Sequence, residues 1–295
     1  MFEGIFTALI TPFKDGQIDG AALDALIDRQ LDAGVDGLVP CGTTGESATL
    51  SVDESLEVIA RTVGRVAGRC KVVAGVGSND TQKTMGLAKS AAGLGVDGLL
   101  VITPYYNKPT QAGLIAHFEA VSDSVPDTPI MLYNVPGRTG VSLTVDAIAQ
   151  LAKRDNIVAL KEATADMAFA TRIIAACGDS LALLSGDDIT ALSMWAIGGR
   201  GVVSVSSNLV PERLVELWQS FTSGRLDEAR RIHLSLASLF DGLFIESNPV
   251  PVKTLVAERT GLCTGELRLP LVELRPESRT VLAEICERLE IGLKR

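Results

Sequence analysis

Residues 129–161 read PIMLYNVPGRTGVSLTVDAIAQLAKRDNIVALK and contain one complete strand–helix–strand unit. The apolar runs at 129–133 and 157–161 have the length and composition of buried strands. Between them, residues 144–154 place apolar side chains at helical spacing. Strands that alternate with helices are typical of parallel βαβ units, so this stretch predicts a piece of a parallel sheet.

The same pattern recurs along the rest of the chain. Eight strands close a barrel, whereas a doubly wound sheet typically needs five or six and carries a glycine-rich dinucleotide turn after its first strand. Here Thr11-Pro12-Phe13 follows the first strand. We therefore expect a (β/α)8 TIM barrel over residues 1–224 and a C-terminal helical extension over residues 225–295 that packs on it. The other expected strands are 4–10, 37–41, 71–76, 98–103, 181–185 and 201–206, and the other expected helices are 21–33, 52–67, 81–94, 112–124, 167–177 and 189–197.

Composition excludes several classes of function. Lys and Arg total 27 against 36 Asp and Glu, which gives a net charge of -9 and no basic run. Nucleic acid and anionic membranes both require a cationic face, so neither is an expected partner. The N-terminus does not resemble a secretory signal, and no stretch has the ~18 apolar residues of a spanning helix. We expect a cytoplasmic protein.

The cysteines and histidines indicate neither a metal site nor a Ser-His-Asp triad. The five cysteines are widely spaced and form no CxxC pair, which is typical of reduced thiols. The only histidines, His117 and His233, lie in helix-like segments rather than at strand ends.

Barrels of this kind place their chemistry where strands end, and polar side chains follow five of the expected strands. Lys161 ends one strand on the side of Ile157 and Ala159. If that side is the interior, the ammonium is partly desolvated, and desolvation favours the free amine that attacks a ketone. The alternative is that Lys161 is a structural residue that pairs with an acidic neighbour. Tyr133 ends the preceding strand and could move protons for imine formation, or it could be a core or interface tyrosine.

The loop after the second strand, Gly42-Thr43-Thr44-Gly45-Glu46, offers main-chain N–H groups and hydroxyls that suit a carboxylate. No GKS or GKT follows, so the pattern of a phosphate loop fails. Asp187 and Asp188 occupy the usual phosphate position of barrels and would repel a phosphate. Phosphorylated substrates and pyridoxal phosphate are therefore not expected.

Four motifs resemble those of the dihydrodipicolinate synthase (4-hydroxy-tetrahydrodipicolinate synthase) family, and the resemblance covers essentially the whole chain. They are Gly42 to Glu46, Tyr133-Asn134-Val135-Pro136-Gly137-Arg138-Thr139-Gly140, Lys161-Glu162-Ala163 and Asn248-Pro249-Val250-Pro251-Val252-Lys253. The family belongs to the pyruvate-dependent class I aldolases, together with N-acetylneuraminate lyase and keto-deoxy sugar acid aldolases. Those relatives share the lysine and the tyrosine, so a sister aldolase is one alternative, and a keto-acid-binding barrel without turnover is another.

The resemblance implies a role for each matched residue. Lys161 would form a Schiff base with pyruvate, Thr43 and Thr44 would hold the pyruvate carboxylate, and Arg138 would bind the carboxylate of L-aspartate 4-semialdehyde. A planar guanidinium suits a carboxylate, although Arg138 could also be a surface turn residue. A proton relay would comprise Tyr133, Thr44 and Tyr106, the last from a neighbouring subunit, while Gly186 and Val203 would line the substrate site.

The resemblance also implies a place in diaminopimelate and lysine biosynthesis, no metal or organic cofactor, and a homo-oligomer, commonly a tetramer built from tight dimers. Some members are inhibited by lysine at the dimer interface. Histidines in those members correspond to Val52 and Ser55, and a glutamate corresponds to Lys83, so we expect weak inhibition or none. The matching positions are Ser47, Ala48, Val52, Ser55, Asn79, Lys83 and Tyr105.

Overall fold

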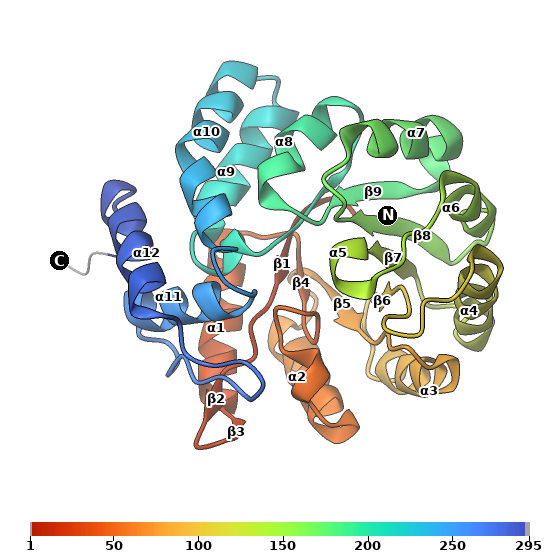
Figure 1. The fold of residues 1–295 in the computed structure, drawn as a ribbon, viewed down its shortest axis with the longest axis horizontal. Coiled ribbons are helices and arrows are strands. Elements are labelled where there is room, and N and C mark those ends of the chain that lie inside the picture. The colour runs from red at the N-terminus through yellow and green to blue at the C-terminus, as the bar shows by residue number, and fades with distance from the viewer. Residues whose placement is uncertain (1, 293–295) are drawn as a thin grey trace.

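A closed barrel of parallel strands forms the centre of the molecule (Figure 1). The computed structural model describes residues 2–292. The strands follow one another around the barrel in the order β1, β10, β9, β8, β7, β6, β5 and β4, and this arrangement confirms the predicted fold class. The strands are β1 (Gly4–Ala8), β4 (Gly37–Val39), β5 (Lys71–Gly75), β6 (Gly98–Ile102), β7 (Ile130–Asn134), β8 (Ile157–Glu162), β9 (Ala182–Ser185) and β10 (Gly201–Ser204).

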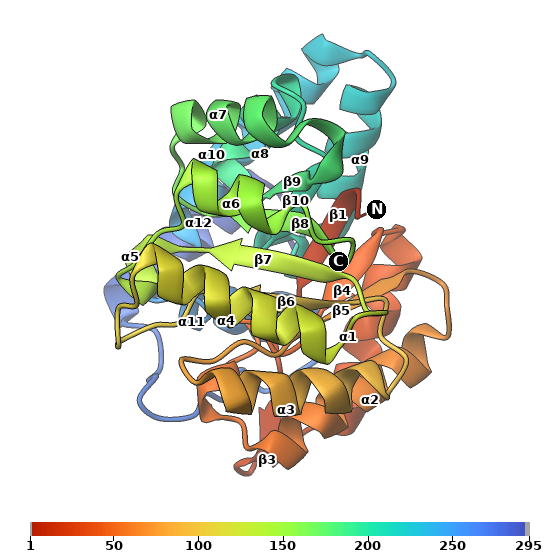
Figure 2. The same ribbon diagram turned by 90° about the vertical axis from the view of Figure 1, so that its right-hand side faces the viewer.

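Helices surround the barrel, as Figures 1 and 2 show from two directions. Besides the predicted elements, the structure contains the short hairpin of β2 (Phe13–Lys14) and β3 (Gln17–Ile18) and the single turn α5 (Pro136–Thr139) after β7. The expected strands at 4–10 and 201–206 are each two residues shorter than predicted. The helices between strands are α1 (Gly20–Ala33), α2 (Val52–Val66), α3 (Thr81–Ala92), α4 (Gln111–Ser124), α6 (Val145–Leu151), α7 (Met167–Cys177) and α8 (Asp188–Ala196), and the 3-10 turns are η1 (Ser47–Thr49), η2 (Gly178–Ser180) and η3 (Ser206–Asn208).

Helix α2 begins with a reciprocal cap directly after the loop that the sequence marks as a carboxylate site. The Ser51 hydroxyl accepts from the Glu54 N–H at 3.1 Å, and the Glu54 carboxylate accepts from the Ser51 N–H at 2.8 Å. Such a capping box satisfies two main-chain donors that the first helical turn leaves free. The Arg268 guanidinium also contacts Glu54, and these bonds lower the pKa of the Glu54 carboxyl to about 2. The start of α2 is therefore fixed.

Side chains from alternate positions of the strands fill the barrel interior. The interior cluster includes Phe6, Val73, Met131 and Val203, all fully buried. Phe2 closes the end of the barrel at which the strands begin, and its ring packs edge-on against Phe6 at 5.8 Å between centroids. The cluster extends to Tyr133 at the other end, where the strands finish.

The remaining helices are α9 (Pro211–Thr222), α10 (Leu226–Gly242), α11 (Val250–Thr260) and α12 (Pro276–Arg288). Helix α10 packs against α8 and α9 of the barrel ring and against α12. The division of the chain into two units at residue 224 stays a prediction. Within residues 2–292, no helix has the length and apolar character needed to cross a membrane.

Gly75 supports the loop that follows β4, because the two backbones touch there. A Cβ on Gly75 would lie 2.2 Å from the Cys41 carbonyl oxygen. We expect Gly75→Ala to destabilise the protein by about 1 to 3 kcal/mol, the usual effect of overpacking a rigid site. Gly64, in the last turn of α2, has nothing within 4 Å of its virtual Cβ and supplies the matched control. Gly64→Ala should stabilise by about 1 kcal/mol. Urea unfolding measures both, and equal effects would contradict the close-contact argument.

Candidate active site

Lys161 and Tyr133 lie side by side at the ends of neighbouring strands. The register pairs Tyr133 of β7 with Lys161 of β8, and Ile102 of β6 with Tyr133. The Lys161 Nζ atom lies 4.3 Å from the centre of the Tyr133 ring, and both residues are 6% exposed. The ammonium is thus held at the top of the interior cluster beside a phenol.

Gly186 leaves space for the Lys161 side chain. A Cβ at position 186 would lie 2.7 Å from the Ala163 Cβ and 3.2 Å from the Lys161 Cε. Burial raises the pKa of the neighbouring Asp187 carboxyl, the Asp188 charge adds to this, and the positive charge of Lys161 opposes it. Asp188 itself is structural, since its Oδ2 accepts from the Val205 and Ser206 N–H groups at 3.1 and 3.0 Å.

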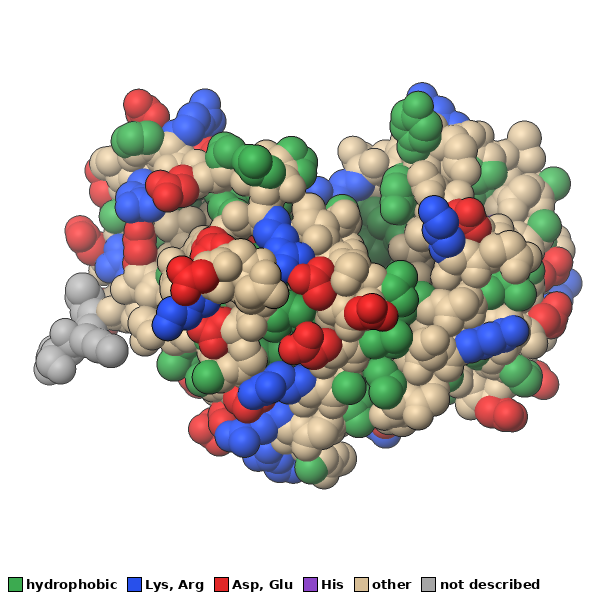
Figure 3. All heavy atoms as spheres, turned by 90° about the horizontal axis from the view of Figure 1, so that it is seen from below, with side chains coloured by type: hydrophobic (Ala, Val, Ile, Leu, Met, Phe, Trp, Pro, Cys, Tyr) green, Lys and Arg blue, Asp and Glu red, His purple; other side chains and the backbone are tan. Residues whose placement is uncertain are grey.

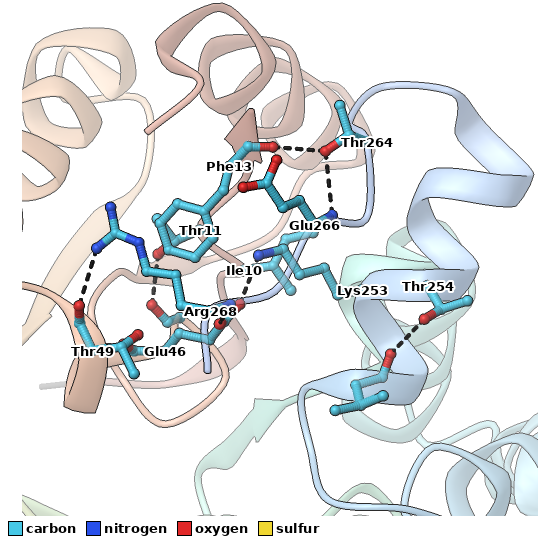
Figure 4. A network of polar contacts seen from close by, with 12 residues as sticks. Ile10, Thr11, Phe13, Glu46, Thr49, Lys253, Thr254, Thr264, Glu266 and Arg268 are labelled. Atoms are coloured by element: carbon cyan, nitrogen blue, oxygen red, sulfur yellow. Dashed lines mark hydrogen bonds and ion pairs between the residues drawn. The ribbon is translucent and has the colours of Figure 1, made fainter. Parts of the chain in front are cut away.

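A second buried lysine, Lys253, forms the ion pair that the alternative interpretation assigned to Lys161. Its Nζ lies 2.6 Å from the Glu46 Oε1, and both side chains are completely buried. Burial lowers the pKa of Lys253, and the Glu46 charge opposes this shift. Figure 4 shows the pair together with Phe13, whose ring centre lies 4.1 Å from the ammonium. Among the described residues, Lys161 forms no salt bridge of this kind.

The Thr43–Thr44 loop is held from several sides. Gly45 accepts from the Thr11 hydroxyl at 2.7 Å, and the Glu46 Oε2 accepts from the Arg268 N–H at 3.1 Å. Asn248 reaches the loop from the segment before α11, where its Nδ2 donates to the Thr44 Oγ1 at 3.0 Å. Within residues 2–292, no hydrogen bond joins Thr44 to Tyr133.

The sequence motifs contain Glu46, Asn248 and Lys253 but do not predict these contacts. The partners are 204 and 207 positions apart, beyond the reach of any local pattern. The only available signal was a lysine and a glutamate inside otherwise apolar or small-residue motifs.

Arg138 lies on α5, which a buried polar cluster attaches to the strand ends. The Asn134 Oδ1 accepts from the Leu143 N–H at 3.0 Å, and its Nδ2 donates to the Glu162 Oε2 at 2.8 Å. Burial raises the pKa of the Glu162 carboxyl, although hydrogen bonds from Thr164 and Asn134 oppose this. Asn134 and Glu162 thus fix the loop that carries Arg138, and the Arg138 side chain itself is exposed.

Three further residues near the strand ends differ in how far they are exposed. Tyr106 is 88% exposed, so its own subunit leaves the phenol uncovered. Val203 is fully buried inside the barrel on β10, paired with Phe6 of β1. Cys41 lies next to the threonine loop, but burial raises its pKa to about 12, which excludes it as a nucleophile at neutral pH.

The seven positions matched to a lysine site are spread over η1, α2, α3 and the loops after β5 and β6. Val52 is 60% exposed and Lys83 is also exposed, whereas Ser55 is buried with its hydroxyl donating to the Ser51 carbonyl at 2.9 Å. Ser47 and Ala48 are exposed, Asn79 is half-buried and Tyr105 is 37% exposed. The charge on the surface is a separate matter: Figure 3 shows acidic and basic side chains interspersed on one face of the molecule, without a broad basic patch.

Comparisons with known proteins agree with the motifs. A family model described as "Dihydrodipicolinate synthetase family" matches residues 1–289. The 4-hydroxy-tetrahydrodipicolinate synthase of Pelobacter propionicus is 48% identical over 287 residues, which cover 97% of this chain and 98% of that protein. The enzyme of the same name from Geotalea uraniireducens is 47% identical over 293 residues, 99% and 100% of the two chains. The crystal structure of dihydrodipicolinate synthase from Aquifex aeolicus superposes with a TM-score of 0.96 at 46% identity and covers 100% of both chains.

Proposed function

Because this chain belongs to the dihydrodipicolinate synthetase family, we propose that it condenses pyruvate with L-aspartate 4-semialdehyde to give 4-hydroxy-tetrahydrodipicolinate. The enzyme is a lyase, as the names of its relatives indicate. One observation supports Lys161 as the reactive residue: it is buried beside Tyr133 and has no carboxylate partner within the described residues. The relatives do not favour a sugar acid aldolase, and they do not favour a binding barrel without turnover.

The reaction uses the lysine as a temporary covalent carrier. The Lys161 amine adds to the ketone carbon of pyruvate, and loss of water gives an iminium. Loss of a proton from the methyl group then gives an enamine, whose carbon attacks the aldehyde of the second substrate. The amine of that substrate attacks the iminium carbon, closes the ring and releases Lys161. The iminium accepts the electron pair in this sequence, so the chemistry requires no further cofactor.

The other residues take the roles that the family implies. Thr43 and Thr44 hold the pyruvate carboxylate, and Tyr133 with Thr44 and Tyr106 moves protons between the substrate and solvent. Arg138 binds the carboxylate of L-aspartate 4-semialdehyde. Gly186 leaves room beside Lys161, which its close approach to the Lys161 Cε supports. Val203 contributes its main chain.

The assembly we propose is a homotetramer of tight dimers in which Tyr106 enters the partner's site. Its 88% exposure supports a surface that a partner covers. One solved relative, with a TM-score of 0.95 and 39% identity, is described as the first monomeric dihydrodipicolinate synthase variant. A place in diaminopimelate and lysine biosynthesis follows from the activity, and a cytoplasmic location stays a prediction.

Pyruvate and borohydride together should add one reduced pyruvyl group at Lys161, because borohydride reduces the iminium to a stable amine. Peptide mass spectrometry locates the group. Lys161→Arg should abolish the adduct, since a guanidinium stays protonated at any working pH. An unmodified wild-type protein, or an adduct on Lys253, would overturn the proposed function.

Arg138→Ala should impair use of L-aspartate 4-semialdehyde far more than formation of the pyruvate adduct. Loss of a charged hydrogen bond costs about 1.5 to 3 kcal/mol, on the order of 10 to 100-fold in kcat/KM. Steady-state kinetics for the aldehyde and the rate of borohydride trapping measure the two half-reactions. Equal damage to both would mean that Arg138 only holds the loop.

Mixed dimers test whether Tyr106 acts across the interface. Lys161→Arg and Tyr106→Phe subunits are each expected to be inactive alone. When they are co-expressed, a mixed dimer regains one intact site, so activity should return to about one quarter of wild type for random pairing in a two-fold dimer. No recovery, with mixed dimers verified by mass spectrometry, would place Tyr106 in its own subunit's site.

L-Lysine should inhibit this enzyme weakly or not at all. A glutamate at ~4 Å attracts an ammonium by ~4 kcal/mol at an effective dielectric of 20, whereas Lys83 repels it by a similar amount before screening. Lys83→Glu alone should restore little, because Val52 and Ser55 remain. Initial rates against L-lysine at saturating pyruvate measure this, and strong cooperative inhibition of the wild type would refute the charge argument.

A further inference from the structure

Asn248 and Thr44 form an isolated polar contact at the mouth of the barrel. The Asn248 Nδ2 lies 3.0 Å from the Thr44 Oγ1, and the two residues are 5% and 3% exposed. The Asn248 Oδ1 is buried and has no hydrogen-bond partner among the described residues. Among the described residues, the Thr44 hydroxyl is therefore the only hydrogen-bond partner of the Asn248 side chain.

This contact determines what the Thr44 hydroxyl can do with its proton. A threonine hydroxyl donates one hydrogen bond and accepts up to two. When it accepts from the Asn248 amide, its own proton stays free for another acceptor. An acceptor at position 248 would instead bind that proton and withdraw it from any relay.

We propose that Asn248 is a positioning residue that orients the Thr44 hydroxyl, so that its proton points away from residue 248 and into the proton relay. The proposal rests on the proposed function, in which Thr44 and Tyr133 move protons. The Asn248 Nδ2 contacts the Thr44 hydroxyl, and in this proposal Asn248 acts through Thr44.

The surrounding structure keeps Asn248 at this distance. The Lys253–Glu46 ion pair joins the same two segments as the Asn248–Thr44 bond, at 2.6 Å and with both side chains fully buried. The Arg268 N–H and the Thr11 hydroxyl also bind the threonine loop. Both ends of the Asn248–Thr44 bond are thus fixed by contacts that do not involve the substrate.

Two substitutions separate this role from simple packing. Asn248→Asp keeps the shape but can only accept from Thr44 when ionised, whereas Asn248→Ala removes the contact and leaves the hydroxyl free to turn. We expect Asn248→Ala to lower kcat at saturating pyruvate on the order of 10-fold, and Asn248→Asp to lower it on the order of 100-fold or more, within the range of general acid–base effects. Repulsion of pyruvate by the new carboxylate would raise KM for pyruvate, and saturation removes that effect from kcat.

A purely structural role would make the loss of kcat follow the loss of stability, which a buried carboxylate at position 248 also causes, so the unfolding temperatures of both variants are measured beside kcat. A loss of kcat that follows the fall in unfolding temperature overturns the proposal. Asn248→Asp with kcat equal to or above that of Asn248→Ala overturns the proposal. Thr254→Val is the matched control, because it removes another buried hydrogen bond, from the Thr254 hydroxyl to the Val250 carbonyl at 2.8 Å, one turn into α11. It should lower the unfolding temperature and leave kcat unchanged.

A double-mutant cycle tests the coupling even if Asn248→Asp fails to fold. If Asn248 acts through Thr44, then Thr44→Val with Asn248→Ala should have the kcat of Thr44→Val alone. Losses that multiply would overturn the proposal. Borohydride trapping of the wild type distinguishes the two levels: absence of the Lys161 adduct refutes the proposed function, whereas a normal adduct with independent Asn248 effects refutes this inference alone.

Discussion

The buried ion pair between Glu46 and Lys253 is the constraint on which the position of the threonine loop depends. Two full charges without solvent contact are expensive to bury, and they persist only where geometry and further hydrogen bonds compensate them. Here the Arg268 N–H binds the second carboxylate oxygen and the Phe13 ring lies against the ammonium. Removal of one partner would leave the other charge buried and unpaired. The pair therefore holds residues 44–46 against residues 248–253, and this contact helps to position Thr44.

The two halves of the site are therefore positioned by different physical means. Lys161 and Tyr133 meet because parallel register and strand alternation place them as neighbours on the interior side. Thr44 lies on a loop, so strand register does not determine its position. Polar contacts with residues far away in the sequence determine it instead. The Arg138 loop is a third case, since Asn134 and Glu162 attach it to the same strand ends through buried hydrogen bonds.

These differences explain what the sequence could predict. Strand alternation is local, so the eight barrel strands and the neighbourhood of Lys161 and Tyr133 follow from runs such as 157–161. The β2–β3 hairpin has only two residues in each strand, too short for any periodicity. The Asn248–Thr44 and Lys253–Glu46 contacts join residues more than 200 positions apart, and no pattern of apolar residues states which buried polar groups pair. The predicted functional roles of the site residues remain predictions.

The two buried lysines, Lys253 and Lys161, are identical side chains in different surroundings. Lys253 has a carboxylate at 2.6 Å, and such a partner favours the charged form that an ion pair requires. Lys161 is also buried, at 6% exposure, but it forms no salt bridge among the described residues, and the Tyr133 ring lies beside its Nζ atom. A nucleophilic amine must give up its proton, which a tight carboxylate partner would resist. The contact that fixes the loop thus engages Lys253, while Lys161 has no ion-pair partner among the described residues.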